Sequence, residues 1–519
     1  MMGNTSVGGK LRTFFLDNVV MLIFLGFVVL GFAVSETFTP SSFTNELLTR
    51  FFRNGLLILA LIIPVMAGLG LNFGIVVGAL AGMLAIIFVR YHYTVFHGFG
   101  ALMLAFLVAT PIAILFGFLT GKLYNKTRGQ EMIASLIVSF FAEGVYGLIV
   151  LFGIGGLIPV RWGHRMINPV PYGQRGIGVR SAFDLGLPAE EMGTGRGMAA
   201  DEYPGMARAL NNLWRIEFVY ALAIVAIALF AFLLIRRIYM KRNPAVALQI
   251  NEPFWAFVVK SVLCGAAVIF SIYSSGVIYY WHNVLANTPE ITRLDHLPGI
   301  SNFAVEISRI NRVPVVTGLV IGAVGLFVVY FSKTKLGQDC RSVGQSQPIA
   351  NVSGINVDRT RIIATIISTV LAAWGMIIYL QDMGHVSTYT VHRNIGFFSV
   401  AAILVGGATA AKASVKNAMV GLVLFHAMFI VSPAVGLFIF NDGNAGEYMR
   451  TFLVYGVIGL SLGLYVWKAL KAARDKLKLN IDPPPEHNGG ESPPSDNGNG
   501  GADDKADPLG TLASKMMQE

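Results

Sequence analysis

Long apolar runs, separated by short polar segments, make up most of the chain. A membrane helix has to cover about 30 Å of hydrocarbon and rises about 1.5 Å per residue. Runs of that length lie at about residues 18–34, 98–120, 132–152, 216–235, 255–281, 313–331, 361–381, 416–436 and 447–467. This pattern predicts an all-α polytopic membrane protein.

Two further apolar stretches do not fit one ordinary crossing each. Residues 55–89 are apolar almost throughout, and one helix over them would be about 52 Å long, which is too long for a single crossing. We therefore expect two helices with a break near residues 70–74. Residues 396–407 form a short run that ends in two glycines, which predicts a half-helix or a tilted span. In total, we expect about ten to twelve crossings.

Basic residues gather in the short segments on one side of these predicted crossings. With the N-terminus inside, the segments that hold Lys122, Arg236 and Lys335 face the cytoplasm, as the positive-inside rule favours. The loop 153–215 carries seven arginines and is nevertheless placed outside, because long loops translocate largely regardless of charge. Both termini are therefore expected in the cytoplasm.

The composition independently indicates a membrane protein and limits its partners. Hydrophobic residues make up 54% of the chain and charged residues only 13%, whereas soluble domains carry about a quarter charged residues. The net charge of +10 would suit a nucleic acid. However, the basic residues stand in short loops beside apolar spans, where membrane orientation explains them, and we expect no nucleic-acid partner.

The sequence offers no catalytic machinery of its own. It lacks the G-x-x-x-x-G-K-[ST] phosphate loop, and its polar segments are too short for a nucleotide-binding domain. The histidines are scattered without metal-ligand spacing, so no metal or other cofactor is expected. Two cysteines, Cys264 and Cys340, give no disulfide framework. We expect a protein that is not an enzyme and that takes energy from a partner or from an ion gradient.

Changes in composition divide the chain into five parts. The segment 153–215 is rich in Gly and Pro, and the stretch after residue 473 combines a proline triplet with repeated Gly and Asn, a composition that cannot bury a core. The predicted parts are an N-terminal transmembrane block (1–152), an extracytoplasmic insert (153–215), an inserted helix pair with loops (216–312), a C-terminal transmembrane block (313–472) and a disordered cytoplasmic tail (473–519).

A polar, glycine-punctuated segment at 332–360 lies between two strongly apolar spans. It resembles the cytoplasmic coupling segment of ABC-importer permeases, in the family that moves branched-chain amino acids, ribose-like sugars and nucleosides. The matching residues are Thr334, Gly337, Arg341, Gly344, Gln345, Ala350, Gly354 and Ile355. A loop between membrane helices can carry glycine and arginine without a coupling role. Other segments of the chain therefore have to decide between a coupling segment and an ordinary loop.

Further segments carry the same resemblance. Gly68–Gly82 is similar to the broken helix of this family, with Phe73 and Gly74 in place of the usual Leu-Ser. Ile403–Thr409 resembles the family's Gly-Gly turn, and Gly129–Ser135 resembles its approach to the next helix. The resemblance covers residues 18–152 and 313–467. Residues 153–312 have no recognised counterpart, but this insertion holds an even number of predicted crossings and so leaves segment 332–360 in the cytoplasm.

The resemblance implies a transport subunit in a bacterial cytoplasmic (inner) membrane. Two permease subunits, as a homodimer or a heterodimer in the lipid bilayer, would bind two ATPase subunits, and an extracytoplasmic solute-binding protein would deliver a small polar solute. ATPase coupling is assigned by the resemblance to Thr334, Gly337, Arg341, Gly344, Gln345 and Gly354. It does not separate sugars, nucleosides and branched-chain amino acids.

Candidate substrate-pathway residues lie at the predicted helix break and in one other span. Gly70, Asn72 and Phe73 stand at the break, and unwound backbone in a membrane is tolerated only beside a cavity or within protein. Glu143 lies in the middle of an apolar span, where a carboxylate is costly. It is predicted either to take part in transport or to be bonded between helices. Gly78, one turn of helix beyond Gly74, is better explained by close helix packing.

Two other functions remain open at this level. A gradient-driven secondary transporter would require intramembrane acid pairs or ion ligands and an inverted repeat, and the sequence shows only Glu143 and no convincing repeat. A membrane scaffold that recruits partners through its insert and tail is the second alternative.

Overall fold

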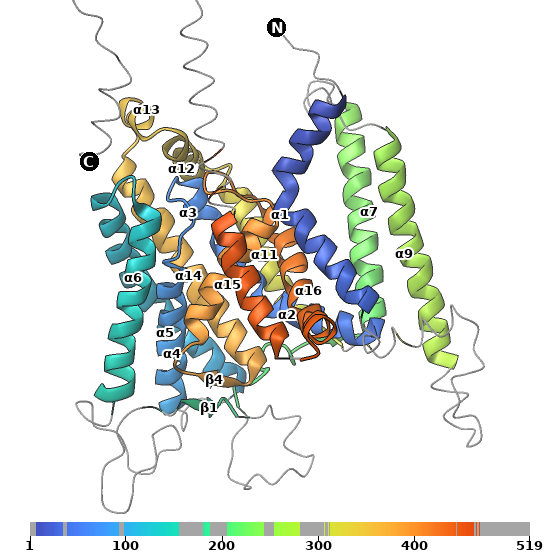
Figure 1. Cartoon of the computed structure of the whole chain (residues 1–519), viewed down its shortest axis with the longest axis horizontal. Coiled ribbons are helices and arrows are strands. Elements are labelled where there is room, and N and C mark those ends of the chain that lie inside the picture. Colours follow the sequence, from blue (N-terminus) through green and yellow to red (C-terminus); the bar gives the residue numbers. More distant parts are fainter. Residues whose placement is uncertain are drawn as a thin grey trace, which may run out of the picture. The chain divides into compact units, whose positions relative to one another are not determined.

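The computed structural model describes residues 7–34, 39–92, 98–154, 179, 181–186, 205–242, 254–280, 306, 310, 312–442, 444–460, 463 and 467 (Figure 1). In the first half of the chain the helices are α1 (Val7–Val34), α2 (Pro40–Ala60), α3 (Ile62–Met66), α4 (Ile75–Tyr91), α5 (Gly98–Lys126), α6 (Glu131–Tyr146), the π-helix η1 (Gly147–Gly153) and α7 (Phe218–Arg242). They are followed by α9 (Phe254–Tyr280), α11 (Val315–Phe331), α12 (Lys335–Gln345), α13 (Gln347–Val352), α14 (Val357–Met383), α15 (Val391–Val405) and α16 (Val415–Phe440). Residues 445–460 are also helical.

Seven of the described helices are long and apolar enough to cross a membrane: α2 with α3, α5, α6 with η1, α7, α9, α14 and α16. Helix α11 passes the same test together with α12, from which it is bent by 71°. Helices α4 and α15 and the Val19–Val34 part of α1 are shorter apolar helices. The expected all-α polytopic class is therefore confirmed.

Two short sheets mark one end of the helix bundle. Strand β1 (Ala182–Asp184) pairs antiparallel with β4 (His385–Ser387), and β2 (Arg215–Ile216) pairs with β3 (Val313–Pro314). Figure 1 shows α12 and α13 at the opposite end of the bundle from β1 and β4. We call these the α12 end and the β4 end. Most of the predicted insert 153–215 and the predicted tail 473–519 lie outside the described residues.

The predicted break between two helices lies at residues 67–74, between α3 and α4. Two glycines in it have positive φ, Gly68 at 75° and Gly70 at 67°, a conformation that glycine adopts without strain. The first helix of the pair is longer than its apolar run, because it begins at Pro40. Thr39 caps that start, since its side chain accepts a hydrogen bond from the Ser42 amide at 3.2 Å.

Helix α14 lies at the centre of the fold, where it packs against α2, α4 and α5. Glycines make the close approach possible, as was expected for Gly78. A Cβ on Gly78 would lie 2.6 Å from the carbonyl oxygen of Thr369, and one on Gly82 would lie 2.5 Å from that of Ala373. A Cβ on Gly117 of α5 would lie 2.8 Å from the Cα of Ile366.

Residues 216–312, predicted to be an inserted helix pair with loops, contain the helices α7 and α9. They pack against each other, and Ser271 of α9 donates a hydrogen bond to the carbonyl oxygen of Val219 in α7 at 2.6 Å. Most of their other side chains are exposed and apolar, which is the surface that lipid tails would cover.

Replacing Gly78 by leucine is expected to destabilise the protein, because the new side chain has no space against the backbone of α14. Overpacking of this kind costs about 1–3 kcal/mol. The unfolding temperature of the purified protein in detergent, monitored by size-exclusion chromatography after heating, measures the effect. The matched control is Gly265→Leu in α9, where a Cβ meets nothing within 4 Å. Equal unfolding temperatures for the two variants would contradict the packing described here.

Candidate functional site

The predicted coupling segment forms two short helices, α12 and α13, each with a side-chain cap at its start. Thr334 Oγ1 accepts a hydrogen bond from the amide of Gly337 at 3.3 Å and donates one to the carbonyl of Phe331 at 2.7 Å. Ser346 caps α13 by accepting from the amide of Ile349 at 3.5 Å. These caps hold the helices in a fixed position at the end of α11.

Two of the predicted coupling glycines are required by close backbone contacts. A Cβ on Gly337 would overlap the carbonyl oxygen of Phe331, so only glycine permits the sharp turn from α11 into α12. A Cβ on Gly344 would overlap the carbonyl oxygen of Met66, and one on Gly68 would lie 2.8 Å from the Cα of Gly344. Helix α12 therefore packs backbone to backbone on the start of the helix break.

The outward face of α12 and α13 is exposed and carries both charged and apolar side chains. Arg341 and Gln345 are exposed, and Gly354 lies in an exposed turn with φ of 80°. Two apolar side chains on α13 are even more open, Ile349 at 69% and Val352 at 90% exposed. Apolar side chains next to an arginine at the end of a helix bundle are typical of a protein interface.

Cys340 lies on the opposite, inward face of α12. It is fully buried, and burial, with a smaller contribution from neighbouring Asp339, raises the pKa of its thiol to about 12. Since the thiolate is the reactive form, both the burial and the raised pKa slow the reactions of this cysteine.

The helix break is held in place by hydrogen bonds from α5 and α6. Asn72 is buried, and its Oδ1 accepts from the hydroxyl of Tyr124 at 2.7 Å. Both backbone polar groups of Phe73 are bonded, since its amide donates to Ser135 Oγ at 3.2 Å and its carbonyl accepts from Ser139 Oγ at 2.7 Å. A Cβ on Gly70 would lie 2.9 Å from Met132 of α6. Three of the predicted pathway residues thus lie together between α3, α5 and α6.

A buried ion pair next to the break was not foreseen from the sequence. Arg361, fully buried at the start of α14, donates to Glu131 at the start of α6 and to the carbonyl of Tyr124 at 3.3 Å. It ties α5, α6 and α14 together at the α12 end. An arginine at the first position of an apolar run was the available signal, but its partner lies far away in the sequence.

Glu143, the fourth predicted pathway residue, lies near the middle of the helical run formed by α6 and η1. It is not a lone acid, because Arg393 of α15 approaches it to 3.3 Å. Arg393 belongs to the first turn of α15. Glu143 and Phe73 both lie toward α15, since the ring of Phe73 contacts that of Phe397 at 5.5 Å between centroids.

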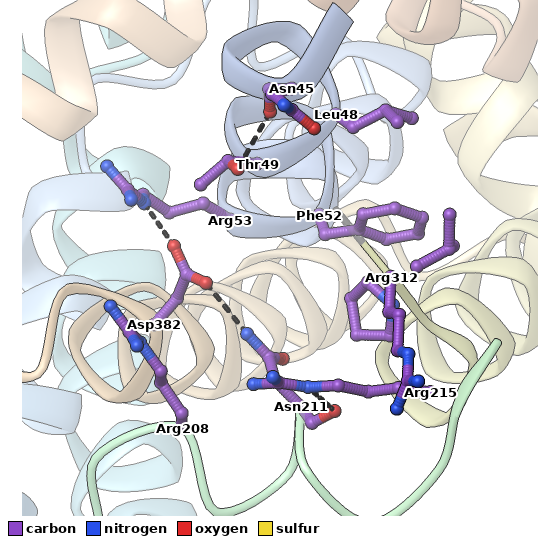
Figure 2. Close-up of a pocket in the computed structure, with 12 residues that line it drawn as sticks. Asn45, Leu48, Thr49, Phe52, Arg53, Arg208, Asn211, Arg215, Arg312 and Asp382 are labelled. Atoms are coloured by element: carbon purple, nitrogen blue, oxygen red, sulfur yellow. Dashed lines mark hydrogen bonds and ion pairs between the residues drawn. The ribbon is translucent and has the colours of Figure 1, made fainter. Parts of the chain in front are cut away.

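A pocket of about 420 Å³ lies at the β4 end (Figure 2). Its charged lining residues are Arg53, Arg208, Arg215, Arg312 and Asp382. Figure 2 shows Asp382, at the end of α14, between two donors: Arg53 Nε at 2.5 Å and Asn211 Nδ2 at 2.7 Å. Guanidinium groups outnumber carboxylates in this lining, so the pocket carries a positive potential.

Sequence comparisons with known proteins place the chain among transport permeases. Residues 205–462 match the family model described as "Branched-chain amino acid transport system / permease component". The chain belongs to this permease family. The matched range contains the whole predicted coupling segment, 332–360. It begins inside the stretch 153–312, for which the sequence patterns had suggested no counterpart. The break at 67–74 and helix α6 lie outside it.

A relative in this permease family is the nucleoside ABC transporter permease protein NupB of Lactococcus lactis subsp. cremoris (strain MG1363). The two chains are 26% identical over 136 residues, which is 26% of this chain and 35% of the relative. The alignment therefore spans about a third of the length of the curated relative. No solved structure matches the chain.

The expected cytoplasmic position of segment 332–360 predicts which thiols react from which side of the membrane. In a Cys264→Ala background, native Cys340 is expected to react with a membrane-impermeant maleimide at least ~100-fold more slowly than an exposed thiol, because it is buried and protonated. In a chain with both native cysteines changed to alanine, Val352→Cys is expected to be labelled rapidly in inverted vesicles and not in intact cells. Fluorescence of the labelled band measures both rates. Rapid labelling of Val352→Cys from outside intact cells would place α13 on the extracytoplasmic side and contradict the expected orientation.

Proposed function

We propose that this chain is the transmembrane permease subunit of an ATP-driven importer for a small polar solute (a sugar, a nucleoside or a branched-chain amino acid), powered by separate ATPase subunits. The observation that carries the proposal is the contact between Gly344 of α12 and the break at Gly68. It links an exposed polar segment at one end of the bundle directly to the irregular backbone between two membrane helices. Membership of the permease family supports the same function.

In this mechanism the ATPase subunits grip the exposed face of α12 and α13. When they close on ATP, they push α12 against the carbonyl of Met66, and the movement passes to α2 with α3 on one side of the break and to α4 on the other. Close backbone packing transmits such displacements because no flexible side chain lies between the two segments to absorb them. Arg361 and Glu131 would keep α6 and α14 together during the movement.

The remaining partners follow from the same proposal. The α12 end would face the cytoplasm of a bacterial inner membrane, together with both termini, and a second permease subunit would complete the pathway. An extracytoplasmic solute-binding protein would then approach the β4 end. The arginine-lined pocket at that end gives the approach an electrostatic basis, because a positive surface speeds the encounter with an acidic partner. The name of the similar protein NupB favours nucleosides among the candidate solutes.

A gradient-driven carrier is the weaker alternative. It depended on Glu143 as an unpaired proton carrier, and the contact with Arg393 gives that carboxylate a partner instead.

Uptake measurements in cells separate the two energy sources. Cells that contain the chain with its ATPase and binding protein are given labelled uridine, ribose or leucine. Uptake of one solute is expected to stop when the ATP-binding lysine of the ATPase is replaced, and to continue through a short exposure to an uncoupler. Uptake that survives the ATPase variant but collapses with the uncoupler would overturn the proposal.

Reversing the charge of Arg341 is expected to disrupt coupling. Arg341→Glu places a carboxylate on the exposed face of α12, where charge-assisted contacts with an acidic groove of the ATPase would be replaced by repulsion. We expect uptake to fall at least ~10-fold, which corresponds to about 1.4 kcal/mol, and less ATPase to co-purify. Lys412→Glu, an exposed reversal in another loop of the same end, is the control and should leave both unchanged. Normal uptake by Arg341→Glu would argue against this docking face.

Filling the contact between α12 and the break tests the transmission step itself. Gly344→Val is expected to abolish uptake, because its side chain would force α12 away from Met66, while the ATPase still binds the outward face. Gly322→Val in α11 is the matched control, since a Cβ there meets nothing within 4 Å. Uptake and co-purification are measured for both. If Gly344→Val transported as well as Gly322→Val, the backbone contact would not transmit the movement.

A further inference from the structure

Three pairs of side chains connect α6 and α15 along one seam. Phe140 and Phe397 lie 6.4 Å apart between ring centroids, Glu143 and Arg393 approach to 3.3 Å, and the rings of Tyr146 and His392 lie 5.2 Å apart. On α6 the three members are three residues apart and share one face; on α15 Phe397 and Arg393 are four residues apart, and His392 is the direct neighbour of Arg393. Glu143 lies near the middle of its helical run and Arg393 in the first turn of α15, so the seam runs from the middle of α6 toward the β4 end.

The ion pair in this seam is open to its surroundings. The side chain of Arg393 is 40% exposed and that of Glu143 is 22% exposed. Charged groups within a membrane span are strongly disfavoured against lipid tails and generally line a water-filled cavity or face the interior of a helix bundle. The ion pair therefore requires water or another protein surface beside it.

Polar atoms without a partner lie at the next pair along the seam. Tyr146 and His392 are buried, and within the described residues the Tyr146 hydroxyl and both ring nitrogens of His392 have no hydrogen-bond partner. Buried polar groups are nearly always satisfied, so these atoms require a water molecule or a ligand. The chain also changes from α-helix to the π-helix η1 directly after Tyr146, and π-helical turns occur frequently at functional sites.

Aromatic rings form the other end of the seam. Phe397 is at their centre and contacts Phe73 of the break, Phe140 of α6 and Tyr455 of the helix 445–460, with centroid distances of 5.5, 6.4 and 6.0 Å. Phe140 is 50% exposed and Tyr455 is 56% exposed. Open aromatic faces of this kind stack on planar heterocycles, and the interaction depends little on which base is bound.

We propose that the α6–α15 seam is a solute site within the permease itself, and that it binds a nucleoside. The base stacks on the rings around Phe397, and its polar edge and the ribose hydroxyls bond to Tyr146, His392 and the Glu143–Arg393 pair. This assignment rests on the proposed function, because the seam would be a binding site along the import path. It differs from an importer in which only the binding protein selects the solute.

The chemistry of the seam distinguishes nucleosides from the other candidate solutes. A nucleoside is neutral and leaves the Glu143–Arg393 pair intact, whereas an amino-acid zwitterion has to compete with that pair for each charge. A free pentose has the hydroxyls but no planar ring for Phe397. Neutral imidazole and phenol groups each offer a donor and an acceptor, which matches the mixed edge of a base.

Binding to the purified full-length permease tests the proposal without ATP or partners. Labelled uridine and adenosine are titrated onto the protein in detergent by a scintillation proximity assay, with ribose and leucine as competitors. We expect both nucleosides to bind and neither competitor to displace them. Phe397→Ala is expected to weaken binding at least about fivefold through lost stacking, whereas Phe438→Ala, an exposed ring of α16, leaves it unchanged. Absence of nucleoside binding, or displacement by leucine, would overturn the proposal.

A second variant separates ligand binding from folding. Tyr146→Phe removes a buried hydroxyl that has no partner in the empty protein, so the thermal stability without ligand should stay equal or rise. Its affinity for uridine should nevertheless fall about tenfold, the value of one hydrogen bond. Lower stability with unchanged affinity would make Tyr146 purely structural and sink the assignment. Because no ATPase is present, this result is independent of whether uptake is driven by ATP.

Discussion

The contact between α12 and the helix break is the constraint on which the rest of the structure depends. Gly344 and Gly68 approach so closely that neither position has space for a Cβ. Direct backbone packing removes the freedom that side chains would otherwise give, so α12 cannot move without moving the break. A helix that is bent 71° away from α11 and capped at Thr334 therefore acts as a rigid extension of the membrane helices rather than as a loose loop.

Helix α14 gives this arrangement a fixed reference. It packs against glycines of α4 and α5 along its length, and its first turn carries the buried Arg361 that binds Glu131. Breaking one partner of a buried ion pair leaves an uncompensated charge, which costs far more than the intact pair contributes. Helices α5, α6 and α14 are thus fixed together at the α12 end, while the break beside them consists of irregular backbone. A displacement of α12 therefore acts first on the break.

The sequence predicted features that depend on local patterns, and it did not predict those that depend on pairing across the chain. Hydrophobic run lengths predicted most helices, and the excessive length of 55–89 predicted the break. The early start of α2 was not predicted, because residues 40–54 are not uniformly apolar and their helix is set by the Thr39 cap and by packing. The partners of Glu143 and Arg361 could not be foreseen, since each lies more than two hundred residues away.

The residues of the proposed sites likewise divide into those that a local motif identifies and those that only the packing of distant segments reveals. Glycines at 337 and 344 were identified by a local motif, and their close contacts explain why that motif requires glycine. Tyr146, His392 and Phe397 carried no local signal, because a histidine or an aromatic residue in an apolar run is usually part of the core. Their significance appears only when α6 and α15 lie side by side and polar atoms remain without partners.

Phe73 connects the two regions to which we assign function. Its peptide unit is held by Ser135 and Ser139 of α6, its ring contacts Phe397 in the seam, and it lies in the same break that Gly344 contacts at Gly68. Only one irregular stretch of backbone therefore separates α12 from the proposed solute site. A push on α12 that shifts the break also shifts the ring of Phe73 relative to Phe397. The same displacement that carries the energy of ATP would then change the aromatic surface that holds the base, so coupling and release of the solute need no separate gate.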